Sequence, residues 1–229
     1  MIHRRFEEEI GELKSRLVRM GANAESMIEK AVKSLLERSP ARHEEVFSLE
    51  KEVNDLHIEV DERAIGILAL QHPVAADLRM VVMCSKIAGE LERVGDQAVN
   101  ICQNTADLLK YPPLKPLIDI PLMADVARGM LRESLDAFVR QDPVLAQKVL
   151  DDDDKVDAFK DQIFRELLTY MMSEPGTIPR ALDLILISRN LERVGDHATN
   201  VAEEVIYAAQ GRDVRHHHEK MKRTGDEKK

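Results

Sequence analysis

The chain has 229 residues, of which 44% are hydrophobic and 33% are charged, and its formal net charge is −9. This apolar content excludes an intrinsically disordered chain and is enough for one large domain or two small ones. The negative charge opposes non-specific binding to nucleic acid or to an anionic lipid surface, because both require a surplus of Lys and Arg. Aromatic residues make up 3% of the chain and Trp is absent, so the composition favours helices over strands.

The first residues lack the apolar stretch of a signal peptide, and no later stretch approaches the roughly 20 apolar residues of a membrane span. We therefore expect a cytoplasmic protein that has no transmembrane segment and does not bind nucleic acid. Its acidic balance favours metal ions or a protein with basic patches as a partner.

Helix-breaking residues divide the chain into six long segments, in which apolar residues recur at helical spacing. In chain order, the breaks fall at Ser39 with Pro40, His72 with Pro73, the run 111–121, Asp142 with Pro143, and the run 173–176.

The central break is rich in proline. Four prolines between positions 112 and 121 are incompatible with a helix interior, so we expect residues 112–120 to form an extended linker. The sequence thus predicts an all-α protein of two tandem three-helix bundles. These are residues 1–111 and 121–212, with a polar tail at 213–229.

An internal repeat relates the two halves. Residues 86–100 match residues 186–200 at nine of fifteen positions, including an unbroken Leu-Glu-Arg-Val-Gly-Asp. The offset between the copies is 100 residues, and each copy falls in the third predicted helix of its half. Duplication of a three-helix unit explains this similarity more simply than chance does.

Each copy carries two acids one helical turn apart. In the first copy, Glu92 and Asp96 lie on a stripe that faces away from the apolar side of the helix. Such a pair of carboxylates repels by roughly 0.2 to 0.5 kcal/mol in an isolated helix. A bound cation would reverse this penalty, so the repeated pair is a candidate cation site.

The second and third helices of each half are expected to form an antiparallel hairpin, which brings further acids opposite these pairs. In the first half, a residue of the second helix and a residue of the third are expected to face each other when their numbers add up to 146. In the second half the corresponding sum is 349. The predicted pairs are Glu92 with Asn54, Asp96 with Glu50, Glu192 with Asp157, and Asp196 with Asp153.

These oxygen-rich sets suit hard or borderline cations such as Mg, Mn, Fe or, less well, Zn. Because Asn54 supplies an amide where the second half has Asp157, we expect tighter metal binding in the second half. An alternative stays open: the acids form a solvated stripe in which Arg93 and Arg193 neutralise their neighbours. The outer members of the acidic run 151–154 are interpreted as charges at a helix start.

Motifs of common enzyme classes are absent from the sequence. It contains no Gly-rich phosphate loop, no HExxH, no Cys-x-x-Cys and no nucleophile elbow. A run of three His at 216–218 lies in the polar tail and is not interpreted as a metal site.

Several short segments together resemble the PhoU family. The doubled LERVGD segment is the main signature, and four others are similar to family features. They are HPVAADLR at 72–79, KVD at 155–157, LLTYMM at 167–172 and GRDVRH at 211–216.

The resemblance implies two three-helix bundles in tandem, often dimeric, with multinuclear metal sites at paired Glu/Asp-x-x-x-Asp motifs. In this sequence the implied ligands are Glu92, Asp96, Glu50, Asn54, Glu192, Asp196, Asp153 and Asp157.

The function implied by the resemblance is regulatory and non-enzymatic. The protein would limit phosphate uptake and repress the phosphate-starvation response, by linking the phosphate ABC transporter, through its ATPase subunit, to a sensor histidine kinase. It would then act in the cytoplasm, near the inner face of the membrane. Two alternatives remain at this point: a metal-dependent hydrolase or oxidase, and a purely structural helical scaffold.

Overall fold

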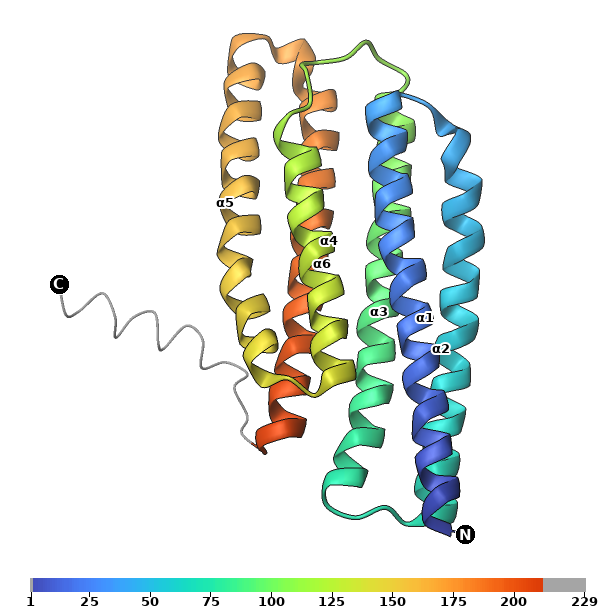
Figure 1. Cartoon of the computed structure of the whole chain (residues 1–229). Helices are drawn as coiled ribbons and strands as arrows, with labels where there is room; N and C mark the ends of the chain where they lie inside the picture. Colours follow the sequence, from blue (N-terminus) through green and yellow to red (C-terminus); the bar gives the residue numbers. More distant parts are fainter. Residues whose placement is uncertain (1, 212–229) are drawn as a thin grey trace, which may run out of the picture.

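The structure is a computed structural model that describes residues 2–211, and within this range it contains helices and no strands. Six long helices and two short 3-10 helices follow one another along the chain (Figure 1). They are α1 (Ile2–Glu37), η1 (Pro40–Arg42), α2 (His43–Gln71), α3 (Ala76–Leu108), α4 (Asp119–Arg140), α5 (Pro143–Ser173), η2 (Pro175–Thr177) and α6 (Ile178–Gln210). The predicted all-α architecture of two three-helix bundles is confirmed. The predicted tail at 213–229 and its His residues lie outside the described residues.

Helices α1, α2 and α3 pack together as one bundle, and α4, α5 and α6 pack as a second. The two bundles lie side by side, with α3 against α6 and α1 against α4 (Figure 1). The α2–α3 turn and the α5–α6 turn lie at opposite ends of the molecule, and α3 runs antiparallel to α6. Helices α3 and α6 therefore each contact both their own bundle and the other one.

Helix α1 shows why these segments fold as they do. Its buried residues alternate at spacings of four and three, which places one apolar stripe along a helix that lies in a bundle. The residues of this stripe include Leu13, Leu17, Met20, Ala24, Met27 and Ala31, none of which is exposed to solvent. Equivalent stripes on the other helices close one continuous core across both bundles.

A glycine lies where α1 approaches α4. A Cβ atom on Gly21 would lie 2.0 Å from Cδ1 of Leu135, a distance that real Cβ atoms do not show. Nearby, the guanidinium of Arg128 on α4 donates to Glu25 and Glu29 on α1, at 3.3 and 3.1 Å. Helices α1 and α4 are thus joined by both packing and ion pairs.

Helix α5 begins earlier than the acidic run suggested. Its N-cap is Asp142, whose Oδ1 accepts hydrogen bonds from the amides of Val144 and Leu145, and Pro143 occupies the first helical position. Residues 151–154 therefore lie in the helix interior, and their interpretation as charges at a helix start is wrong. The aspartate before the proline is the residue that satisfies the free amides.

The linker is shorter than expected at its C-terminal end. Helix α4 starts at Asp119, so Pro121 lies in the first helical turn. A proline is tolerated there because the amides of the first turn have no partner within the helix. No helix in the described part of the chain combines the length and apolarity that a membrane crossing requires.

Candidate functional site

The acidic residues of the second repeat lie on neighbouring helices. Glu192 and Asp196 belong to α6, and Asp153 and Asp157 belong to α5. Val194 and Gly195 are buried between the two acids of α6, so the acidic side chains point away from the core. A Cβ atom on Gly195 would lie 3.5 Å from Oδ1 of Asp153. The α5 carboxylate therefore lies within van der Waals reach of the α6 backbone next to Asp196. We call these four residues the second acidic face.

Lys160 joins the two helices at this face. Its Nζ donates to Oδ1 of Asp157 at 2.7 Å and to Oε1 of Glu192 at 3.0 Å. Burial alone would lower the pKa of Lys160, but these two hydrogen bonds and the two negative charges outweigh burial and raise it above the ordinary lysine value. The ammonium is therefore a built-in cation that already neutralises part of the second acidic face.

The charged form of Asp196 is disfavoured at this face. Its pKa is raised above the ordinary aspartate value, first because neighbouring protein atoms remove part of its hydration, and second because Glu192 lies one turn away. Asp157 adds to this effect, while Lys160 and His197 oppose it only in part. A carboxylate that is disfavoured in its charged form is the expected state of a cation ligand without its cation.

The corresponding residues of the first repeat, Glu50, Asn54, Glu92 and Asp96, form the first acidic face. Here Asn54 acts as a hydrogen-bond donor: its Nδ2 donates to Oε1 of Glu50 at 3.1 Å along α2. Arg93 donates to Glu90, at 2.7 Å, and not to Glu92 or Asp96. Arg93 therefore neutralises a neighbouring acid that lies outside the repeated pair, and the solvated-stripe alternative stays open.

The predicted hairpin register of the first repeat is confirmed by two contacts. Ser85 donates to Asp61, and these numbers sum to 146. A Cβ atom on Gly89 would lie 4.0 Å from Nε2 of His57, and these numbers also sum to 146. In the second repeat, the shared contact of Lys160 with Asp157 and Glu192 agrees with the predicted facing of these two acids.

Oxygen donors of this kind suit divalent cations in chemical type. In the side-chain conformations of residues 2–211, however, no three Asp, Glu, His or Cys residues lie close enough together to hold a metal ion. Binding at the second acidic face would require Lys160 to release Asp157 and Glu192, with a change of side-chain rotamers. All four residues reach solvent.

Sequence reasoning missed a polar contact between the two repeats. Oε2 of Glu90 on α3 accepts hydrogen bonds from Nδ1 of His197, at 2.8 Å, and from Nδ2 of Asn200, at 2.9 Å, on α6. Burial alone would raise the pKa of Glu90, but these hydrogen bonds outweigh burial and lower it. Close by, Lys86 on α3 pairs with Glu204 on α6, at 2.8 Å. The partners are more than 100 residues apart in sequence, so no local pattern could reveal them.

The fold and its acidic faces first define a class: an all-helical protein of two duplicated three-helix bundles, each with an outward-facing Glu-x-x-x-Asp pair. Comparison with known families gives the family. The chain matches the PhoU domain twice, over residues 17–105 and 120–205, which together make up more than half of its length. The chain belongs to the PhoU family.

Relatives cover nearly the whole chain. A phosphate-specific transport system accessory protein PhoU homolog from Aquifex aeolicus is 38% identical over 94% of this chain and 97% of its own length. The homolog of the same name from Pseudomonas putida is 37% identical, over 94% and 84%.

Solved structures agree with this family. The crystal structure of PhoU from Pseudomonas aeruginosa superposes with a TM-score of 0.87 at 35% identity, over 90% of this chain and 100% of that one. The phosphate transport system regulatory protein PhoU from Streptococcus pneumoniae superposes with a TM-score of 0.83 at 23% identity, over 91% and 99%, and supports the fold alone.

The raised pKa of Asp196 predicts that its negative charge destabilises the metal-free fold. At pH 7, Asp196→Asn should increase the free energy of unfolding by up to about 1 kcal/mol, the range of solvent-screened charge interactions. The gain should shrink as the pH falls through the raised pKa and vanish below the ordinary aspartate pKa of about 3.9, where both states are protonated.

Urea unfolding in the presence of a chelator measures this difference at each pH. Asp161→Asn, on the exposed side of α5, is the matched control and should change the free energy of unfolding little at any pH. A loss of stability in Asp196→Asn at pH 7 would show instead that the carboxylate supports the fold.

Proposed function

We propose that this chain is a non-enzymatic regulator of phosphate transport and of the response to phosphate starvation. The proposal rests on how much of the chain is similar to its relatives. Relatives named phosphate-specific transport system accessory proteins align with 94% of the chain, across both repeats and the linker. Similarity confined to one repeat would support the fold and no more.

A more specific proposal concerns the partners and the sign of the regulation. We propose that the chain restrains the starvation response in phosphate-replete cells by contacting the ATPase subunit of the phosphate ABC transporter and a sensor histidine kinase. It would do so in the cytoplasm, at the inner face of the membrane, and as a homodimer. The net charge of −9 and the two outward acidic faces favour partner surfaces that carry basic patches.

We further propose that the acidic faces bind Mg, Mn, Fe or Zn ions. Glu192, Asp196, Asp153 and Asp157 would hold the ions on the second face, and Glu92, Asp96, Glu50 and Asn54 on the first. A bound ion would supply positive charge that relieves the repulsion between neighbouring carboxylates. The raised pKa of Asp196 supports this role, because it identifies a carboxylate whose charge is not fully compensated.

The other candidate functions have less support. A metal-dependent hydrolase or oxidase would need a general base or nucleophile, and the names of the relatives describe accessory and regulatory proteins. A purely structural scaffold would gain no stability from a mutually repelling pair of acids in either copy of the repeat.

The two acidic faces should differ in metal affinity. Asp157→Ala removes a carboxylate from the second face, whereas Asn54→Ala removes only a neutral amide from the first. We expect Asp157→Ala to lower the bound metal more, by about tenfold in affinity for Mn²⁺, because Asp157 contributes a full negative charge.

Elemental analysis and calorimetric titration of tag-free protein measure the two effects. The double variant Glu192→Ala with Asp196→Ala should lose metal and keep its helical circular dichroism, since both side chains lie off the core. Equal losses in Asp157→Ala and Asn54→Ala would refute the ranking, and global unfolding of the double variant would refute a surface site.

A phosphatase reporter of the phosphate-starvation response tests the function in phosphate-replete cells. Deletion of the gene should raise reporter output, and the wild-type copy should restore repression. The double variant Glu192→Ala with Asp196→Ala should fail to restore it, whereas Asp55→Ala with Glu62→Ala, two exposed acids elsewhere on α2, should succeed. Unchanged output after deletion would contradict the regulatory function and leave only the fold assignment.

A further inference from the structure

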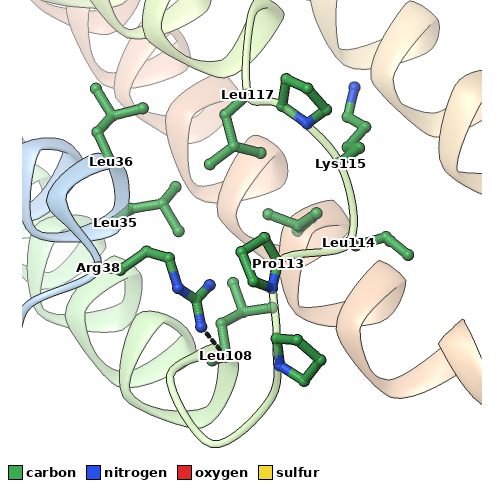
Figure 2. A pocket seen from close by; sticks show the side chains of 11 residues that line it. Leu35, Leu36, Arg38, Leu108, Pro113, Leu114, Lys115 and Leu117 are labelled. Atoms are coloured by element: carbon green, nitrogen blue, oxygen red, sulfur yellow. Dashed lines mark hydrogen bonds between the residues drawn. The ribbon is translucent and has the colours of Figure 1, made fainter.

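A cavity of about 280 Å³ lies where the linker passes between the two repeats. Figure 2 shows side chains from α1, α3, the linker and α6 converging on it. Its apolar wall is formed by Leu35, Leu108 and Leu184, which are buried, and by Leu114 and Leu117 of the linker, which are partly buried. The volume is near the lower end of the range for small-molecule sites.

The cavity is held open by rigid backbone. Pro112, Pro113 and Pro116 all line it, and their fixed φ angles prevent the linker from collapsing into the space. The carbonyl of Pro112 accepts a hydrogen bond from Arg180 on α6, at 3.2 Å. The Nζ of Lys115, whose side chain is 6% exposed, pairs with Glu166 on α5. The linker is therefore fastened to the second repeat on both sides of the cavity.

Arg38 fastens the linker to the first repeat. It directly follows α1 with a φ of 51°, a left-handed conformation that is uncommon for residues other than glycine. Its Nη2 donates to the carbonyl of Leu108, at 3.4 Å, and to that of Tyr111. Figure 2 shows the guanidinium beside Leu35, Leu108 and Pro113 at the cavity wall.

The charge of the lining is one-sided. Arg38 and Lys115 are its only ionisable residues, in a chain whose net charge is −9. Glu166 compensates Lys115. Arg38 meets two neutral carbonyls, and within residues 2–211 no carboxylate lies within ion-pair distance of it. An uncompensated guanidinium at an apolar wall favours an anionic group with an apolar body attached.

We propose that this cavity binds a small amphipathic anion, a molecule with one carboxylate and an unbranched apolar chain. The carboxylate would pair with Arg38, and the chain would lie among Leu35, Leu108 and Leu184. A volume of about 280 Å³ suits a small ligand, and octanoate is the probe chosen to represent this class. Because the lining comes from both repeats and the linker, the ligand would bind the junction of the two bundles.

Calorimetric titration of the tag-free full chain with octanoate and with 1-octanol separates the charge from the apolar chain. Wild type should bind octanoate about tenfold more tightly than octanol. Arg38→Gln should reduce this preference to about twofold or less, while Arg38→Lys, which keeps the charge, should retain most of it. Arg42→Gln, on a nearby arginine that pairs with Glu37 outside the cavity, should bind both probes as wild type does.

A second variant tests the cavity without touching the charge. Leu36 lines the cavity and is 43% exposed, so Leu36→Trp can fill the opening without disturbing the core. It should weaken binding of both probes by about tenfold and leave the helical circular dichroism unchanged. The proposal is overturned by equal affinity of wild type for the two probes, by no binding of either, or by full binding to Leu36→Trp. An unchanged preference for octanoate in Arg38→Gln would also overturn it.

Discussion

The antiparallel packing of α3 against α6 determines where the acidic faces and the linker lie. Both helices carry the repeated LERVGD segment, and each must bury one side in its own bundle and another against the other repeat. Only the outward side, next to α2 or α5, is left for Glu92, Asp96, Glu192 and Asp196. The same packing places the two acidic faces on one body and brings the linker over the junction, where the cavity forms.

The polar residues between α3 and α6 show how the duplication has diverged. Glu90 pairs with His197. With the repeat offset of 100, Asn190 is the counterpart of Glu90, and Gln97 is the counterpart of His197. Asn190 and Gln97 are buried neutral amides. One position of the symmetric interface thus carries a charged contact, while its counterpart carries amides. The acidic faces differ in the same way, since the second has Asp157 and Lys160 where the first has Asn54 and His57. Two repeats of one fold therefore present different electrostatic surfaces.

Patterns that act within one helix or one hairpin were predictable from the sequence. Prolines and helical periodicity located the six helices, and the hairpin register predicted for the first half agrees with the hydrogen bond of Ser85 to Asp61. The break at Asp142 with Pro143 was located correctly, but the outer acids of the run 151–154 were wrongly interpreted as helix-start charges, because the run is more conspicuous than the single cap at Asp142. Lys160 could have been found, since it lies one turn after Asp157. The contacts of Glu90 and Arg38 could not, because tertiary packing alone brings their partners together.

The contact between α3 and α6 should make the two duplicated bundles one cooperative body. Differential scanning calorimetry of the full chain measures this cooperativity. We expect a single transition whose calorimetric and van't Hoff enthalpies agree, because neither bundle can unfold without exposing the shared core. Two separate transitions, or a van't Hoff enthalpy near half of the calorimetric value, would show instead that the repeats unfold independently.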